Sequence, residues 1–483
     1  MVGLAQGKGG VRALAGLGAV ALVAGCHPVA SRTEAQMPMV QQLSTGGAAF
    51  SASVPEIAVD PANPQRVAVI WRDLAMTRPG EPAGERGMQC HLSLSKDGGR
   101  SFDTQPLVWA MADTPVCNSP YVDIGPQGEL LIGATLAGVL PQNAPEGEHA
   151  SGRVVMRLST DWGHNWSPIY SGIATGDEAR FEANATVPAE ATHVPWDGGR
   201  GVIDAVSGEI ILSGGYPAPP GEALRSQRFY TVSKDRGKSW GPIRAFGAPG
   251  WPQRWDGHYV VAHGTLAFSY LAEAVPVDGV KCLCVVFATS ADGGATVQRH
   301  LVTQVEYFDR LVHYPPIAAH PAHAGQYALA LASDKAGTPS VRITRDGGAH
   351  WQALDGPVAP EGVVRSSRPA LAYTPDGVLG LLWRGYHADG SYDLYIAASA
   401  DGERFGPVQR VSPASSRVPD ALVKDYSAGG DFISSLGAGS DAFHAAWTGW
   451  PTGAAGQVMY ARVPVARLLE DQFALKSKIV SQN

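Results

Sequence analysis

A short phrase recurs six times along the chain, and it constrains the fold more than any other feature. Each copy has a serine or threonine, an aspartate two positions later, and then a glycine. The aspartates are 54 to 74 residues apart. They are Asp97, Asp161, Asp235, Asp292, Asp346 and Asp401. A repeat of this period indicates one supersecondary unit that is used many times within a single fold.

Each copy follows a stretch of alternating polar and apolar residues, such as VVMRLS before Asp161 and RFYTVS before Asp235. Alternation that runs into Asp-x-Gly predicts a β-strand entering a tight turn. In such a turn the carboxylate accepts backbone N–H groups, and the glycine supplies a positive φ angle. We therefore predict that the six aspartates stabilise turns rather than carry out chemistry.

Two more strands precede each copy, and the first often begins with proline, as in VPEIAVD, SPYVDIG, PPIAAHP and RPALAYT. With one strand after the turn, each unit has four strands, which predicts an all-β propeller of antiparallel blades with the repeated turn between the third and fourth strands. The final unit, DFISSLG, AFHAAW and QVMYARVPV, has only three. MPMVQQLS near the start supplies a fourth, so we expect seven blades, with six as the alternative.

One propeller over residues 45–465 accounts for most of a chain whose 483 residues would otherwise suggest several domains. Residues 26–44 are then a tether that includes the closing strand. Residues 466–483 are a C-terminal tail, either a short helix or disordered.

The N-terminal residues 1–25 have the pattern of an export signal. An apolar stretch from Ala13 to Gly25 is too short for a comfortable membrane span and ends in VAGC. Small residues before Cys26 resemble the lipobox of bacterial lipoproteins, a likeness that implies lipidation of Cys26. An ordinary signal peptide is the alternative. The resemblance implies a protein anchored to the cell envelope by lipid alone, at the outer membrane of a Gram-negative host.

The net charge of −7 and the pI near 6.1 argue against nucleic acid as a partner. In an exported protein, Cys90 and Cys117 form the plausible disulfide. Cys282 and Cys284 lie on one side of a predicted strand, where we expect free thiols. The spacing of the histidines and cysteines fits no zinc site, and we expect no metal, no cofactor and a monomer.

The six phrases resemble the Asp-box, or BNR, repeat of sialidases and related propellers, over about residues 45–465. Such propellers include sialidases, other glycosidases and proteins without catalysis. Sialidases resemble one another further in an Arg-Ile-Pro motif, two more arginines, a Tyr–Glu pair and an acid/base Asp. Here Ser53-Val54-Pro55 stands in place of Arg-Ile-Pro, and Asp256 falls near the expected Glu. The standard set is therefore not present, and a rearranged set that uses Arg368, Arg384 and Tyr386 stays open.

A propeller collects functional groups at the mouth opposite the repeated turns, where the loops between second and third strands meet the entry to the first strand. Aromatic, arginine and carboxylate side chains in these stretches are typical of a glycan site. The predicted catalytic residues are Asp256, Tyr386 and Asp73. The predicted binding residues are Arg72, Arg254, Trp255, His258, Arg310, Tyr314, Arg368 and Arg384.

Three functions remain open at this point. The first is a lipid-anchored glycoside hydrolase similar to sialidases, and the second is a propeller that binds glycans or proteins without catalysis. The third is a structural or assembly lipoprotein of the envelope. A glycan or glycoconjugate is the partner expected from the first two.

Overall fold

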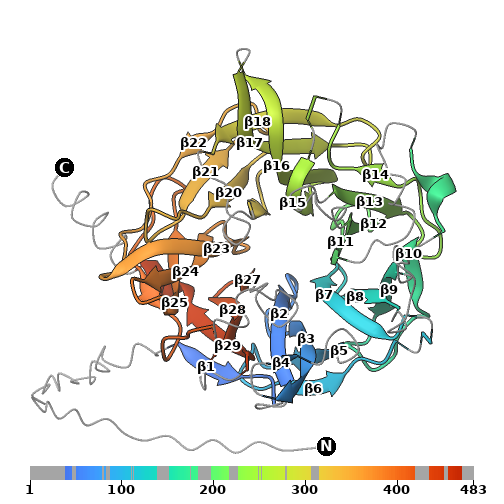
Figure 1. Cartoon of the computed structure of the whole chain (residues 1–483), viewed down its shortest axis with the longest axis horizontal. Coiled ribbons are helices and arrows are strands. Elements are labelled where there is room, and N and C mark those ends of the chain that lie inside the picture. The colour runs from blue at the N-terminus through green and yellow to red at the C-terminus, as the bar shows by residue number, and fades with distance from the viewer. Residues whose placement is uncertain are drawn as a thin grey trace, which may run out of the picture. The chain divides into compact units, whose positions relative to one another are not determined.

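A computed structural model shows a ring of β-sheets (Figure 1). The described residues all belong to one compact unit, 38–483. They are 38–45, 50–78, 81–82, 88–109, 111–112, 114–138, 152–174, 176–182, 197–216, 227–248, 250–251, 253–277, 280–305, 315–418, 434–450 and 455–469.

The ring has seven blades, and within each one neighbouring strands are antiparallel. Blade 1 contains β2 (Phe50–Val59), β3 (Val67–Arg78), β5 (Met88–Ser95) and β6 (Asp103–Pro106), with β4 (Glu81–Pro82) paired to β3. Blade 2 contains β7 (Val116–Ile124), β8 (Leu130–Ala137), β9 (Gly152–Ser159) and β10 (Tyr170–Ala174). Blade 3 contains β11 (Asp197–Ile203), β12 (Ile210–Tyr216), β13 (Gln227–Ser233) and β14 (Arg244–Ala245).

The next three blades repeat this order. Blade 4 contains β15 (Gln253–Ala262), β16 (Thr265–Val277), β17 (Val280–Ser290) and β18 (Gln298–Gln304). Blade 5 contains β19 (Ile317–Ala319), β20 (Tyr327–Leu331), β21 (Ser340–Thr344) and β22 (Gln352–Ala353). Blade 6 contains β23 (Val363–Tyr373), β24 (Leu379–His387), β25 (Tyr392–Ser399) and β26 (Gln409–Arg410).

Blade 7 closes the ring with strands from both ends of the propeller. Its order is β27 (Ser434–Ala438), β28 (Ala442–Gly449), β29 (Gln457–Pro464) and then β1 (Met39–Gln42). Met39 pairs with Arg462 and Gln42 pairs with Met459. The closing strand predicted from MPMVQQLS is therefore confirmed, and seven blades rather than six are present.

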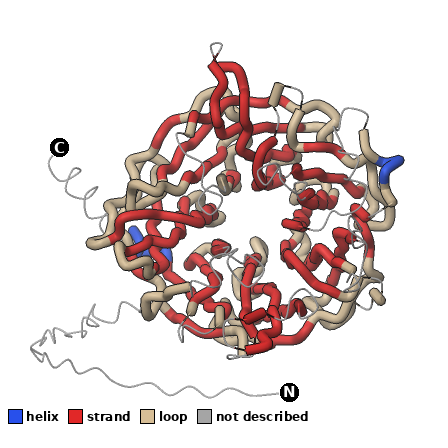
Figure 2. Tube along the Cα trace, viewed as in Figure 1, coloured by secondary structure: helices blue, strands red, loops and turns tan. Residues whose placement is uncertain are grey.

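Helix is almost absent from the described residues (Figure 2). A 3-10 turn spans Glu178–Arg180, and a short helical segment covers residues 465–469, at the start of the predicted tail. None of the described helices has the length and apolar character needed to cross a membrane. The predicted signal segment, its Cys26 and the rest of the tail lie outside the described residues.

The repeated turns have the hydrogen bonds predicted for them. Asp161 accepts the backbone N–H of Asn165 at 2.8 Å, and Ser159 Oγ accepts the N–H of Gly163 at 2.8 Å while donating to Asp161. Five of the six aspartates accept the N–H four residues later, and Asp401 accepts those two and three residues later. These bonds favour the ionised carboxylate and lower the pKa of Asp161 to about 2.

The repeated turns lie at the same end of the blades as the turns between first and second strands. The Gly98 N–H donates to the Gln65 carbonyl at 2.8 Å, and the Gly347 N–H donates to the Gly325 carbonyl at 2.9 Å. In an antiparallel blade, the connection from the second to the third strand therefore lies at the opposite end.

Two disulfides are present, one of them predicted. Cys90 and Cys117 join blade 1 to blade 2 with their Cα atoms 5.7 Å apart, as expected. The prediction of free thiols in blade 4 is wrong, because Cys282 is bonded to Cys284 with their Cα atoms 5.6 Å apart. Residues two apart in a strand lie on the same face, and here that placement brings the two sulfur atoms together.

Candidate functional site

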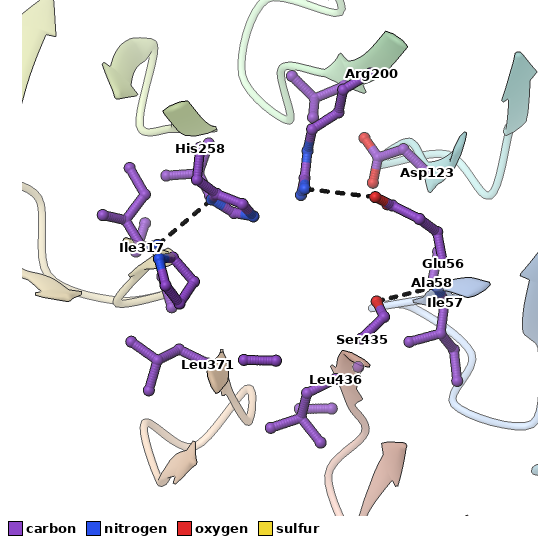
Figure 3. Close-up of a pocket in the computed structure, with 18 of the residues that line it drawn as sticks. Glu56, Ile57, Ala58, Asp123, Arg200, His258, Ile317, Leu371, Ser435 and Leu436 are labelled. Atoms are coloured by element: carbon purple, nitrogen blue, oxygen red, sulfur yellow. Dashed lines mark hydrogen bonds and ion pairs between the residues drawn. The ribbon is translucent and has the colours of Figure 1, made fainter. Parts of the chain in front are cut away.

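A cavity of about 370 Å³ lies on the axis of the ring, and residues of all seven innermost strands or their edges line it (Figure 3). These strands are β2, β7, β11, β15, β19, β23 and β27. Its volume is at the small end of the range for ligand sites, about 300–1,000 Å³. A cavity in this position is the first place to look for function in a propeller.

Bulges in the innermost strands determine which side chains enter the cavity. In β2 the pairing with β3 skips from Ser53 to Glu56, so that Val54 and Pro55 together oppose one residue. The same shift precedes Arg200 in β11 and His258 in β15, and it also occurs in β7 and β23. A bulge adds one residue, bends the strand and re-aims the next side chain.

The local sequence explains these bulges. Proline has no N–H to donate to a neighbouring strand, and it occupies the bulge in three of the blades. The residue before each proline has a positive φ angle, 54° at Val54, 38° at Ser119 and 48° at Arg368. Non-glycine residues rarely adopt this conformation, which costs free energy and concentrates at functional sites.

Polar side chains from blades 1 to 4 form one side of the cavity wall, which we call the polar arc: Glu56, Asp123, Arg200 and His258. Arg200 Nη1 lies 3.9 Å from Glu56 Oε1, and their side chains are 23% and 15% exposed. Asp123 accepts the backbone N–H of Ile203 at 2.8 Å. Two carboxylates and one guanidinium therefore share a small, partly open space.

Burial shifts the protonation of this group toward neutral forms. It raises the pKa of Glu56, against the opposing effect of Arg200 and Arg228. It also raises the pKa of Asp123 to about 6, and the neighbouring charge of Glu56 adds to that rise. Both carboxyl groups therefore keep a proton to a higher pH than usual, and the charge of Glu56 is the smallest of the causes that act on Asp123.

His258 is held as a neutral imidazole. Burial lowers its pKa well below the usual value, and the positive charges of Arg200 and Arg228 lower it further. The backbone N–H of Ile317 donates to His258 Nδ1 at 3.4 Å, so the ring proton is assigned to Nε2. The polar arc thus combines an acid–base pair, a fixed cation and a neutral imidazole, which are groups suited to proton transfer.

The remaining wall comes from blades 5 to 7 and is mostly aliphatic, and we call it the apolar arc: Ile317, Ala370, Leu371, Leu436 and Ala438. Ser435 lies beside it, and its Oγ accepts the N–H of Ile57 at 3.2 Å. Figure 3 shows Leu371 and Leu436 across the cavity from Arg200. Arg368 of blade 6 also lines the cavity, so this wall is not wholly apolar.

Of the predicted site residues, His258 and Arg368 line this cavity. Arg72 and Asp73, on β3, do not. Arg72 is 3% exposed, and its Nε donates to Ser53 Oγ at 3.3 Å. Asp73 accepts the indole N–H of Trp71 at 3.1 Å and lies 3.1 Å from His91 Nε2.

Tyr386 and Arg384, both predicted for the site in blade 6, do not line the cavity either. The guanidinium of Arg365 lies 4.3 Å from the centre of the Tyr386 ring. Arg384 is fully buried, with its guanidinium 4.8 Å from the centre of the Tyr392 ring. Arg310 and Tyr314 are outside the described residues. Arg254, Trp255 and Asp256 belong to β15, but their side chains are outside the description.

Two residues of the polar arc, Glu56 and Asp123, were missed by reasoning from sequence, which placed Arg200 only among the many polar residues expected near the mouth. The sequence signal that could have found these residues lies in the first strand of each repeated unit. Glu56 directly follows Val54-Pro55, and Arg200 follows a pair of glycines at the matching position. Within the described residues, no group of three or more His, Cys, Asp or Glu side chains is arranged to hold a metal ion.

No protein-family model and no curated protein matches this chain. Among solved structures, a protein of unknown function from Dyadobacter fermentans has a TM-score of 0.49 at 12% identity, covering 88% of this chain and 99% of that one. A sialidase from Trypanosoma rangeli has a TM-score of 0.46 at 12% identity, covering 89% and 57%. A Hadza microbial sialidase has a TM-score of 0.44 at 16% identity, covering 79% and 73%. At such identities the likeness concerns the fold alone.

Proposed function

We propose that this propeller is a glycoside hydrolase whose active site is the axial cavity. The observation that carries the proposal is the polar arc, in which Glu56 and Asp123 lie on the same side of Arg200 in a partly open space at the centre of the ring. Hydrolysis of a glycosidic bond needs one carboxyl group to protonate the leaving oxygen and a second group to act as base or nucleophile. The resemblance of the repeated turns to the Asp-box supports a glycan as substrate.

Burial raises the pKa of both Glu56 and Asp123, so either carboxyl group can carry the proton of the acid. In the proposed reaction one of them acts as acid and the other as base. Arg200 balances the charge of the ionised member, and His258 offers a neutral imidazole beside them. Neither the acid nor the base needs a cofactor.

A screen of the purified full chain against fluorogenic glycosides, sialosides included, tests the proposal. We expect turnover of at least one substrate, and a loss of about 10²–10⁴-fold in kcat/KM on Glu56→Gln, since general acid–base groups contribute about that much. Glu209→Gln is the matched control, because Glu209 is paired with Lys234 in a surface turn at 3.5 Å. Absence of turnover at high protein concentration, or full activity of Glu56→Gln, would refute the proposal.

A second function, glycan binding without catalysis, is favoured by one observation. Ser53 occupies the place of the arginine of Arg-Ile-Pro, and its hydroxyl accepts a hydrogen bond from Arg72 at 3.3 Å. Binding to a glycan array without turnover of the matching glycoside would support this function over the first.

We also propose that the chain is exported and anchored to the cell envelope through lipid on Cys26, on the strength of the VAGC segment. Metabolic labelling with a palmitate analogue should mark the wild-type chain and not Cys26→Ser. Equal labelling of both would contradict the anchor.

A further inference from the structure

The sixth repeated turn lacks one hydrogen bond that the other five share. In those five, the second carboxylate oxygen of the aspartate, Oδ2, accepts a hydrogen bond from the side chain four positions later: Ser101, Asn165, Ser239, Thr296 or His350. In blade 6 that position is Phe405, whose side chain has no donor. Asp401 Oδ1 accepts the N–H groups of Glu403 and Arg404, but Oδ2 accepts no hydrogen bond from any residue that the structure describes.

Asp401 also lines a cavity of about 490 Å³ between blades 5 and 6, which we call the turn-end cavity. Three more turns contribute polar side chains to it: His320 and His323 between β19 and β20, Arg345 in the fifth repeated turn, and Asp376 between β23 and β24. All four turns lie at the end of the blades opposite the mouth, and the cavity shares no lining residue with the axial cavity. Its volume is within the range of ligand sites.

Aromatic rings form part of the wall. The centre of the His320 ring lies 4.4 Å from that of His323 and 5.0 Å from that of Tyr373. The backbone N–H of Ala322 donates to His320 Nδ1 at 3.1 Å, and burial lowers the pKa of His320, so this ring is neutral. A Cβ atom at Gly377 would lie 2.5 Å from His320 Nε2, so a larger residue there would displace the ring. The rings therefore offer apolar faces beside the polar groups.

The charges of the wall favour a ligand that donates hydrogen bonds and is not an anion. Arg345 is already engaged, since it donates to the Gly402 carbonyl and to Gln352 Oε1, both at 3.2 Å. The carboxylates of Asp376 and Asp401 remain, and they repel a negative group. A hydroxyl group donates to a carboxylate without bringing a charge of its own.

We propose that the turn-end cavity is a second glycan site, which binds one neutral pyranose unit and has no catalytic role. A ring hydroxyl donates to Asp401 Oδ2, and the C–H face of the sugar packs on the rings of His323 and Tyr373. A glycan bound at this end leaves the mouth free. The site does not depend on the proposed function of the axial cavity.

Histidine NMR signals of the full chain test the proposal at the site itself. The ring signals of His320 and His323 are assigned from His320→Gln and His323→Gln. We expect D-glucose, D-galactose or D-mannose to shift both signals with a dissociation constant of about 1–10 mM, the scale that an ordinary ligand efficiency gives a molecule of this size. The anion N-acetylneuraminate should leave both in place.

Absence of a shift with all three hexoses, or an equal response to the anion, would overturn the proposal. The signal of His258, which lines the axial cavity, separates the two sites. A sugar that shifts only His258 would refute the second site and leave the proposed hydrolase standing.

Asp401→Asn replaces the available acceptor with a donor, and it should weaken hexose binding about 10-fold or more, since a hydrogen bond to a charged group is lost. Asp292→Asn is the matched control and should keep the wild-type affinity, because Asp292 Oδ2 is occupied by the Thr296 hydroxyl at 2.7 Å. The wild-type titration does not depend on either variant folding. Equal affinity in Asp401→Asn and wild type would overturn the contact with Asp401.

Discussion

The repeated turns and the axial cavity both contain aspartate carboxyl groups, but their pKa values are shifted in opposite directions. In the turns, hydrogen bonds from the Asn165 backbone and side chain lower the pKa of Asp161 to about 2, and the carboxylate stays ionised in water. In the cavity, burial raises the pKa of Asp123 to about 6. A carboxylate surrounded by donors stabilises a turn, whereas one that retains a proton up to about pH 6 is available for proton transfer.

A large expected difference between the two regions concerns arginine. Among the described ion pairs, Arg200 is the only cation within 4 Å of Glu56, and Arg200→Met removes it. We expect a loss of about 10²–10³-fold in kcat/KM, which is typical when one positioned donor is removed. Arg236→Met is the control, since Arg236 pairs with Glu129 at 3.0 Å beside a repeated turn, and it should keep full turnover. A similar loss of kcat/KM in both variants would contradict the distinction between the cavity and the turns.

The turns should matter for stability instead. Ser159 is 1% exposed, and its hydroxyl bridges Gly163 N–H and Asp161, so Ser159→Ala should lower the free energy of unfolding by about 1–2 kcal/mol. Asp161→Ala should also lower the melting temperature. Chemical denaturation measures the first effect. Turnover per folded molecule should be unchanged in both, and a fall in turnover without a loss of stability would contradict the structural role.

The smallest expected effect is on stability, which should depend on pH in opposite ways in the two regions. The folded pKa of Asp161 lies below its unfolded value, so its contribution to stability is present above pH 4 and is lost as the pH falls toward 2. The folded pKa of Asp123 lies above its unfolded value, so its contribution is present below pH 4 and is lost as the pH rises through 6. Melting temperatures of Asp123→Asn should therefore fall less between pH 4 and 6 than those of wild type.

The fold could be predicted because it is repeated. Six copies of one phrase give the period, and the missing copy in the last unit, together with MPMVQQLS, gives the closure that the pairing of Met39 with Arg462 confirms. Local chemistry also fixed the turn, since only a short acceptor two positions after Ser159 can reach the N–H of Asn165. These features depend on residues close together in sequence.

The cavity was harder to predict because it depends on register. Side chains alternate across a strand, so one extra residue moves the next side chain to the other face. The bulge at Val54 and Pro55 sends Glu56 toward the axis, and the alternation of the sequence alone does not reveal it. Asp73 was predicted for the mouth from its place near a loop, but it lies on the second strand and contacts His91.

The measurement that tests the account most directly compares two substitutions of the same kind, Asp123→Asn and Asp161→Asn, by kcat/KM on the glycoside that the screen identifies. The axial cavity as the active site predicts a loss of about 10²–10⁴-fold for Asp123→Asn with a folded protein, and wild-type turnover per folded molecule for Asp161→Asn. Full activity of Asp123→Asn, or loss of activity confined to Asp161→Asn, would contradict it.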